Sequence, residues 1–414
     1  MNKTELGELI RNGENSGVEF KRDDVLPEKI AKEMAGLLNL EGGHILLGVE
    51  DDGAVSGLTR GPKKAEEWVM EAARTHIRPG AIPYWEVLNW EAGKDVGVIT
   101  LPADSPDKPY KAKRGSAWVT QIRIGTTTRD ATDEEEVRLY QQSGRLRYDI
   151  KPIPGARMED LDRRRLVNYF RDIRSQKTPD DRDEEGWRRL LMNTDLMVGD
   201  RGEAIPTAGA IILFGLRPNK FVPQAGITAV AYQGTQKDYD AKDRPPPLRG
   251  PVVALRSPAG DVIGTGVIEQ AMDFVRRNTS VEARIDESGQ RRDRWKDFPL
   301  EAVREAVVNA IAHRDYTIGG TDIELSIYGD RLEVISPGQL PNTVTVEKMR
   351  AGYRATRNEL IKEVLRDYRY IEATGLGVPR KIIQGMLDHN GTEPDLVEEP
   401  DRFTVRLWKE RKRS

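Results

Sequence analysis

The chain of 414 residues is long enough for two or three domains, because a domain averages ~150 residues. Its 65 Lys and Arg nearly balance its 68 Asp and Glu, which excludes a histone-like polycation and a strongly acidic solvating protein. The sequence has no cysteine, which excludes disulfides, thiolate metal sites and thiol catalysis. With only four histidines, a metal site must rely on carboxylate and amide oxygens, which favour Mg²⁺, Mn²⁺ or Ca²⁺.

No run of the sequence reaches the ~18 uncharged apolar residues that a membrane-spanning helix needs. The residues Met1–Glu5 lack the apolar core of a signal peptide. We therefore expect a cytoplasmic protein that has no membrane partner.

Residues 1–145 predict one α/β domain. Val18–Arg22 alternates apolar and polar side chains, which is typical of a strand, and Pro27 suits the first turn of the helix that follows. His44–Val49 predicts a strand that ends in the tight turn Asp51–Gly53. Further strands are expected at residues 84–90, 96–101 and 117–124, and an acidic helix at 132–143.

The rest of the chain predicts a linker and two further α/β parts. Pro152, Pro154 and Gly155 indicate a linker over residues 146–157. The apolar run at 208–214 is interpreted as a buried strand, and a second strand is expected at 226–232. The expected parts are a middle region over residues 158–297, a last α/β domain over 298–408 and a basic tail over 409–414.

Three polar residues interrupt an apolar helix that we expect after Pro299. Glu305, Asn309 and His313 follow one another at steps of four, so they lie on one stripe of the helix. Such a stripe is costly to bury without partners, and a carboxylate with an amide one turn away can hold a hydrated Mg²⁺ and orient a water. The alternative is that the three residues only cap or bridge neighbouring elements.

Residues 298–408 resemble the GHKL (Bergerat-fold) ATPases, in the divergent branch labelled RecG-like or transcriptional regulator. The likeness lies in Glu305-x-x-x-Asn309, which resembles the N-box and continues into His313–Tyr316, and in Asp330–Pro341, which resembles the modified G1 region of that branch. Arg357-Asn358 and Gly375-Leu-Gly377 resemble its later boxes. The resemblance implies ATP as cofactor, with Glu305 activating water, Asn309 binding Mg²⁺ and Gly375 to Gly377 bordering the phosphates. One departure is that Ser336-Pro-Gly338 stands where the usual box has an adenine-reading Asp. The residues expected to contact the nucleotide are Asn309, His313, Gly338, Arg357, Gly375 and Gly377.

A second constellation lies near the N-terminus. Glu19 and Lys21 share one face of a strand, and Asp51 and Asp52 follow a nearby strand. Carboxylates that converge beside a lysine are the minimum for metal-assisted phosphodiester cleavage, because the carboxylates hold Mg²⁺ or Mn²⁺ while the lysine stabilises developing charge. The alternatives are an ion pair between Glu19 and Lys21 and ordinary turn chemistry at Asp51–Gly53.

A basic stretch without any acid runs from Lys108 to Arg129. Aromatic residues within it offer stacking surfaces, so the stretch predicts contact with a phosphate backbone, although a solvated face would leave the same pattern. The candidate nucleic-acid contacts are Lys108, Tyr110, Lys111, Lys113, Arg114, Arg123 and Arg129.

Residues 14–130 resemble the Schlafen AlbA_2 domain, which binds RNA or DNA and in some members cleaves it. The likeness rests on Glu14-x4-Glu19-Phe-Lys21, on Gly42–Gly53 and on Ile122–Thr127. It implies that two glutamates and one aspartate hold a divalent metal beside Lys21: Glu14, Glu19 and either Asp51 or Asp52, of which we favour Asp51.

Together these features predict a protein that acts on nucleic acid and is gated by ATP. The AlbA_2 part would bind RNA or DNA and cleave it, plausibly in defence or stress response, and ATP would change the shape or the assembly of a homo-oligomer. One alternative is a non-enzymatic transcriptional regulator that binds DNA and senses ATP. A third interpretation is an ATPase whose N-terminal part only docks partners.

Overall fold

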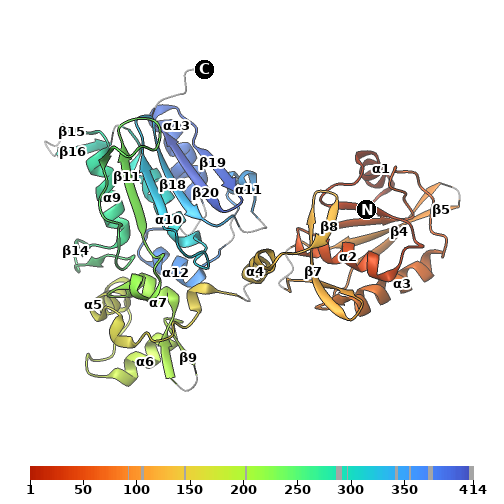
Figure 1. Ribbon diagram of the computed structural model, residues 1–414, viewed down its shortest axis with the longest axis horizontal. Coiled ribbons are helices and arrows are strands. Elements are labelled where there is room, and N and C mark those ends of the chain that lie inside the picture. Colours follow the sequence, from red (N-terminus) through yellow and green to blue (C-terminus); the bar gives the residue numbers. More distant parts are fainter. Residues whose placement is uncertain are drawn as a thin grey trace. The chain divides into compact units, whose positions relative to one another are not determined.

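The computed structural model describes residues 1–91, 93–103, 107–143, 146–200, 203–285, 291–295, 297–340, 344–353, 356–371 and 376–409. The chain divides into two compact units, Met1–Leu146 and Arg147–Ser414, each with its own core (Figure 1). No helix among the described residues is long and apolar enough to cross a membrane.

The described residues of the first unit form two four-stranded sheets and four helices. The sheet with the order β1-β2-β5-β4 has one parallel pair, β1 with β2, and otherwise antiparallel pairs. Its strands are β1 (Val18–Lys21), β2 (Gly43–Leu47), β4 (Tyr84–Glu91) and β5 (Lys94–Leu101). The second sheet joins β3 (Ile77–Arg78), β6 (Lys111–Arg114), β7 (Ala117–Ile124) and β8 (Thr127–Asp130). The helices are α1 (Lys3–Asn12), α2 (Pro27–Asn39), α3 (Pro62–His76) and α4 (Asp133–Gln142).

Alternation along the strands buries apolar residues on both faces of the first sheet. Ile45 and Leu47 of β2 pack with α2 and α3, while Phe20 and Leu46 pack with Leu6 of α1. The strands expected at residues 84–90, 96–101 and 117–124 are confirmed as β4, β5 and β7. A strand in this sheet is therefore covered on both sides, which is why the polar members of β1 lie in a largely buried setting.

One six-stranded sheet organises the second unit (Figure 1). Its order is β12 (Ala241–Asp243), β11 (Ile227–Tyr232), β17 (Ile323–Ile327), β18 (Arg331–Pro337), β20 (Arg402–Trp408) and β19 (Asp395–Glu399). The helices α9 (Val267–Asn278) and α10 (Leu300–His313) cover one face of it, and their buried side chains join those of the strands in one core.

The domain boundary expected at residue 297 separates strands that belong to this one sheet. β11 from the middle region pairs in parallel with β17 along its whole length, from Ile227 opposite Ile323 to Ala231 opposite Ile327. The middle region and the last part of the chain thus share a sheet and a core, so neither has a complete interior of its own.

Shorter elements complete the second unit. Before β11 lie η1 (Tyr148–Ile150), η2 (Met158–Asp160), α5 (Arg163–Val167), the π-helix η3 (Asn168–Ile173), α6 (Glu184–Met192), β9 (Met197–Asp200), β10 (Glu203–Pro206), α7 (Ala208–Phe214) and α8 (Pro218–Phe221). After it lie β13 (Leu255–Arg256), β14 (Val262–Gly264), β15 (Val281–Ile285), β16 (Arg291–Trp295), α11 (Val346–Arg350), α12 (Glu359–Asp367), the π-helix η4 (Gly377–Gln384) and α13 (Gly385–Asn390).

The strand expected at residues 208–214 is wrong, because this run forms the helix α7. Thr207 caps the helix, since its hydroxyl accepts a hydrogen bond of 3.2 Å from the amide of Ala210. All seven residues of α7 are buried. Burial on every side removes the 3.6-residue pattern that separates a helix from a strand.

The residues expected to form a linker belong instead to the second unit. Asp149 is fully buried, and its carboxylate accepts a hydrogen bond of 2.6 Å from the amide of Leu360 in the first turn of α12. Ile153 donates from its amide to the carbonyl of Pro206 at 3.0 Å. Asp149 thus caps a helix that lies more than 200 residues later in the chain, as the first-turn amides of a helix require a partner.

Candidate functional site

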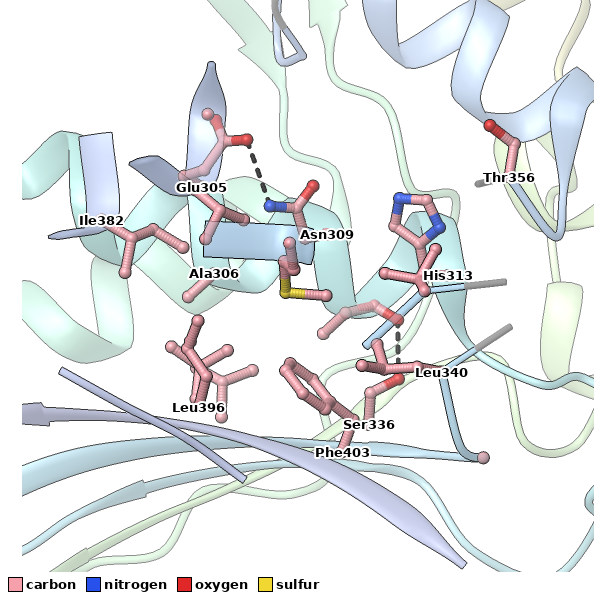
Figure 2. Close-up of a pocket in the computed structure, with 18 of the residues that line it drawn as sticks. Glu305, Ala306, Asn309, His313, Ser336, Leu340, Thr356, Ile382, Leu396 and Phe403 are labelled. Atoms are coloured by element: carbon pink, nitrogen blue, oxygen red, sulfur yellow. Dashed lines mark hydrogen bonds between the residues drawn. The ribbon is translucent and has the colours of Figure 1, made fainter. Parts of the chain in front are cut away.

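The polar stripe of α10 faces a cavity in the second unit. Pro299 lies at the N-cap position of this helix, and most of the helix surface is apolar and buried against the sheet. Figure 2 shows Glu305, Asn309 and His313 side by side along one face of α10, and all three line the cavity. The prediction that these three residues share one face of the helix is therefore confirmed.

Apolar side chains form most of the remaining wall. The cavity encloses about 1170 Å³ of empty space, part of which is open to solvent. Its apolar lining includes Ala306, Val334, Leu340, Val344, Met349, Ile371, Val378, Ile382, Leu396, Phe403 and Val405. Of the described residues that line it, Glu305 is the only carboxylic acid. The lining therefore combines a mainly apolar wall with a few polar groups.

Glu305 is held from three directions. It is 4% exposed, and its Oε1 accepts a hydrogen bond of 3.1 Å from the side-chain amide of Asn309. The amide oxygen of Asn309 is turned away from Glu305 in Figure 2. The Lys381 ammonium lies 3.5 Å from Oε2, and a Cβ placed on Gly377 would lie 1.9 Å from Oε1. Only glycine at position 377 allows η4 to approach the carboxylate this closely.

His313 is partly buried at the end of the stripe. Burial lowers its pKa to about 4, and the nearby charges of Arg357 and Lys362 add to this effect. The imidazole is therefore neutral at neutral pH and can accept or donate one hydrogen bond without carrying charge.

The end of β18 is fastened to α10. The hydroxyl of Ser336 donates a hydrogen bond of 3.0 Å to the carbonyl of Ala310, so the oxygen keeps acceptor capacity toward the cavity (Figure 2). Gly338 follows with φ of 104°, and a Cβ there would lie 2.6 Å from Cβ of Asp315. Because it has no side chain, Gly338 allows the chain after β18 to pass close to Asp315 at the edge of the cavity.

Arg357 and Asn358 satisfy the C-terminal carbonyls of α10. Arg357 donates to the carbonyls of His313 at 3.0 Å and Gln339 at 2.9 Å. Asn358 is fully buried and donates to the carbonyls of Ala312 at 3.0 Å and Arg314 at 2.9 Å. The guanidinium of Arg357, expected to contact a cofactor, therefore acts on the backbone that shapes the cavity. Of the two glycines expected to border the nucleotide phosphates, Gly377 lines the cavity and Gly375 lies outside the described residues.

In the first unit, Glu19 and Lys21 belong to a buried network of charges. Glu19 is 4% exposed and forms ion pairs with Lys21 and, at 2.7 Å, with the guanidinium of Arg123. Arg123, with a fully buried side chain, also lies 3.4 Å from Glu33 of α2 and donates to the carbonyls of Asn15, Ser16 and Val18. The network therefore ties β7 to the segment before β1 and to α2.

Charge pairing sets the pKa values within this network. Burial raises the pKa of Glu33, the negative charge of Glu19 adds to that rise, and a hydrogen bond from Thr128 opposes it. Burial alone would lower the pKa of Lys21, but its hydrogen bond to Glu19 and the charges of Glu19, Glu33 and Glu14 raise it overall. Lys21 accordingly stays charged and compensates buried carboxylates.

The expected metal triad is not brought together. Glu14 accepts a hydrogen bond of 2.8 Å from the amide of Phe20, while Asp51 lies in the exposed turn Glu50–Gly53. Glu19 faces α2, as Ile45 beside it in the register does. Across the part of the chain that the structure describes, no group of three His, Asp or Glu side chains is placed to hold a metal ion. The carboxylates of this arrangement do not fit a divalent metal.

Most basic side chains of the stretch from Lys108 to Arg129 are buried in the first unit or form ion pairs within it. Lys108, Tyr110 and Arg123 are buried, and the Lys108 ammonium donates to the carbonyl of Leu40, so these residues offer no surface to nucleic acid. Three of the remaining basic residues pair with acids that follow the stretch: Lys111 with Glu136 at 2.6 Å, Arg114 with Asp130 at 2.9 Å and Arg129 with Glu135 at 2.9 Å. The chain neutralises this stretch with the acids that begin at Asp130.

A smaller basic and aromatic surface remains on the second sheet. Lys113 is exposed and stands opposite Trp118 in the register of β6 and β7, so the two side chains share one face. The guanidinium of Arg78 lies 4.2 Å above the ring of Trp118. Arg78 was not among the expected contacts, because no pattern in the sequence links this single residue to the stretch. Glu33 and Lys381 also carried no local signal, since their partners are distant in the sequence.

Comparison with known proteins places a family at each end of the chain. Residues 14–132 match the family Schlafen, AlbA_2, and residues 320–407 match the family HATPase_c_4, described as the C-terminal part of the ATP-dependent DNA helicase recG. Both resemblances in the sequence are confirmed, so the chain carries an AlbA_2 domain and an ATPase-like C-terminal domain. The second match begins after α10 and therefore leaves out Glu305 and Asn309.

Two solved structures show more distant likeness. The DIP2311 protein from Corynebacterium diphtheriae is 18% identical, with a TM-score of 0.42, and the match covers 96% of this chain and 65% of that protein. The N-terminal domain of an ATP-dependent DNA helicase RecG-related protein from Nitrosomonas europaea is 20% identical, with a TM-score of 0.25, over 32% of this chain and 94% of that domain. No curated protein matches the chain.

Proposed function

We propose that this protein binds ATP in the cavity of its second unit and nucleic acid through its AlbA_2 unit, with nucleotide occupancy gating the nucleic-acid contact. The observation that supports the nucleotide site best is the Glu305–Asn309 pair on the cavity wall of α10. A carboxylate and an amide oxygen beside a mainly apolar cavity suit a purine with its phosphates.

The residues present fit ATP with Mg²⁺. The amide nitrogen of Asn309 is used by Glu305, so its oxygen is the atom that would hold the metal, and Glu305 would orient and deprotonate water. Apolar residues would contain the base, with the Ser336 oxygen and the neutral His313 as polar contacts. Mg²⁺, when bound, neutralises phosphate charge and polarises the transferred group.

The nucleotide site is tested by the variant Glu305→Ala. ATP binding, measured by isothermal titration, should persist, while ATP hydrolysis should fall by about 100-fold or more, as expected on loss of a general base. Glu301→Ala removes an exposed carboxylate from the same helix and should leave both quantities unchanged. Failure of the unaltered protein to bind ATP contradicts the proposal.

The nucleic-acid surface is proposed at Arg78, Lys113 and Trp118. Two cations beside an aromatic ring can contact backbone phosphates while a base stacks on the ring. Exchange of both Arg78 and Lys113 for Ala should reduce the slope of log K against log salt by about 2 for RNA or DNA. Arg129→Ala, which removes a cation paired with Glu135, is the matched control, and equal effects in the two variants contradict this surface.

The compensated carboxylates of the first unit favour binding without cleavage. Glu19 is paired with two cations, and the described residues place no third carboxylate for a metal. In this proposal the first unit binds nucleic acid and is not a nuclease. Incubation with tRNA, single-stranded DNA and duplex DNA in the presence of Mn²⁺ should leave all three intact. Cleavage that is lost in Glu19→Ala, with the fold retained, supports the nuclease instead.

Gating and assembly are tested on the complete chain. Nucleic-acid affinity should differ between ATP-bound and nucleotide-free protein, and sedimentation in both states measures whether a homo-oligomer forms. Identical affinity and mass in the two states contradict gating, while ATP binding itself would stand.

A further inference from the structure

Gly377 and Lys381, both on η4, contact the same carboxylate of α10. The two residues are four apart, so the close backbone approach at Gly377 and the Lys381 ammonium meet the two oxygens of Glu305. η4 is a π-helix, a geometry that often occurs at functional sites. η4 therefore contacts the one carboxylate that lines the cavity among the described residues, and its own Gly377, Val378 and Ile382 also line the cavity.

This carboxylate is unfavourable for a polyphosphate. Glu305 is 4% exposed beside apolar walls, where like charges repel more strongly than in water. Among the described cations near the cavity, the Lys362 ammonium donates to the hydroxyl of Thr356 at 2.6 Å, and Lys381 lies beside Glu305. Arg357 donates to the carbonyls of His313 and Gln339. The Thr356 end lies near His313, away from Glu305 along the cavity in Figure 2.

Lys381 is able to change partners. Its side chain is 20% exposed, and its ammonium lies 3.5 Å from Glu305, which is a longer contact than the strong charge-assisted hydrogen bonds of about 2.7–2.9 Å. A lysine carries its charge on a flexible four-carbon chain, so the ammonium can reorient while the helix stays in place.

We propose that Lys381 exchanges the Glu305 carboxylate for the phosphates of the bound nucleotide. This inference rests on the proposed ATP site and adds to it a residue that recognises the phosphate tail. Without nucleotide, Lys381 compensates the charge of Glu305. With nucleotide, the same ammonium binds phosphate and leaves Glu305 available to orient water.

The exchange predicts opposite effects for the two partners. Lys381→Met should weaken binding of β,γ-imido-ATP by about 10-fold or more, the size of one lost charge-assisted contact, and should leave AMP binding nearly unchanged. Glu305→Gln should tighten β,γ-imido-ATP by about 3- to 10-fold, because the competing carboxylate charge is gone. Lys381→Arg should retain binding within about 3-fold.

Arg380→Met is the matched control, since Arg380 is an exposed cation of the same helix. Isothermal titration of β,γ-imido-ATP and AMP into each full-length variant measures all these affinities. Equal affinities of Lys381→Met and Arg380→Met overturn the exchange while the ATP site stands, and so does weaker binding by Glu305→Gln. A purely structural role of the ion pair would make both Lys381→Met and Glu305→Gln weaker. Absence of nucleotide binding by the unaltered protein overturns the ATP site and this inference together.

Discussion

The two units solve the same problem, a buried carboxylate, in opposite ways. In the first unit Glu19 is enclosed by Lys21 and by a fully buried Arg123, which also binds three backbone carbonyls. In the second unit Glu305 is paired with the partly exposed Lys381 and borders a cavity. The first network therefore holds the fold together, whereas the second has room for a ligand that can replace a partner.

The difference shows that polar residues grouped by a sequence pattern can form either a site or a structural network. Both constellations suggested metal chemistry, because one aligns a carboxylate with an amide on a helix and the other gathers carboxylates beside a lysine. Space beside the carboxylate and the mobility of its cation separate a candidate site from a structural network, and neither property is encoded in spacing.

The largest effect is expected for Arg123→Met. Its loss leaves Glu19 and Glu33 buried without a guanidinium, together with unsatisfied carbonyls, so we expect a destabilisation of roughly 3–5 kcal/mol. Urea denaturation followed through the first unit measures it. Arg114→Met breaks an exposed pair and should change stability by less than about 1 kcal/mol. Similar losses in both variants would break the distinction between an enclosed network and a surface pair.

Protonation of His313 should destabilise the second unit in acid. Its pKa is lowered from 6.5 to about 4 in the folded chain, so the unfolded chain binds the proton more tightly. The stability contributed by the neutral imidazole is complete above pH 6.5 and is lost as the pH falls toward about 4, by at most about 3 kcal/mol. Denaturation curves between these pH values should differ between the unaltered protein and His313→Gln, which lacks this dependence. Parallel pH profiles would contradict the buried, neutral state.

Asp149→Ala should cost about 1–2 kcal/mol, the usual range for loss of a helix cap. Its carboxylate binds the amide of Leu360 at the start of α12, next to the Asn358 that supports α10. Asp149→Asn keeps an acceptor oxygen and should retain most of the stability. Thermal unfolding of the three proteins measures the series, and an equal loss in the Asn variant would show that charge, not capping, matters here.

The smallest effect on stability is expected for Lys381→Met. Glu305 keeps its hydrogen bond from Asn309, and the Lys381 side chain is partly exposed, so the loss should be much smaller than that of Arg123→Met. Thermal unfolding of this variant also checks that its nucleotide affinity reports on binding. A loss as large as that of Arg123→Met would remove the contrast between the two carboxylates.

Local patterns predicted a large part of the structure. The stripe of Glu305, Asn309 and His313 followed from helix spacing, and the strands around residues 84–124 from alternation. The strand predicted at 208–214 was wrong, because complete burial of this helix removes the periodicity that identifies a helix in the sequence. Contacts between distant residues escaped prediction, as Lys381 with Glu305 and Arg123 with the carbonyls near Asn15 show.

The prediction that the stretch from Lys108 to Arg129 is free to contact a phosphate backbone overlooked its partners for a different reason. The window from Lys108 to Arg129 contains no acid, but the partners of its cations begin one residue later, at Asp130. The tight turn from β8 into α4 returns these acids to the strands that precede them. The charge around a side chain is set by its neighbours in space. A sequence window that ended at Arg129 therefore left out the acids that balance these cations.

The parallel pairing of β11 with β17 limits how the protein can be dissected. A fragment covering only residues 320–407, the span of the C-terminal family match, would lack both α10 and the neighbour of β17. Such a fragment exposes one edge of the sheet and the apolar face that α10 covers, and both invite aggregation. A fragment that starts at Arg147 retains β11, α10 and the Asp149 cap. Expression of the second unit alone, with its cavity, should therefore begin at this residue.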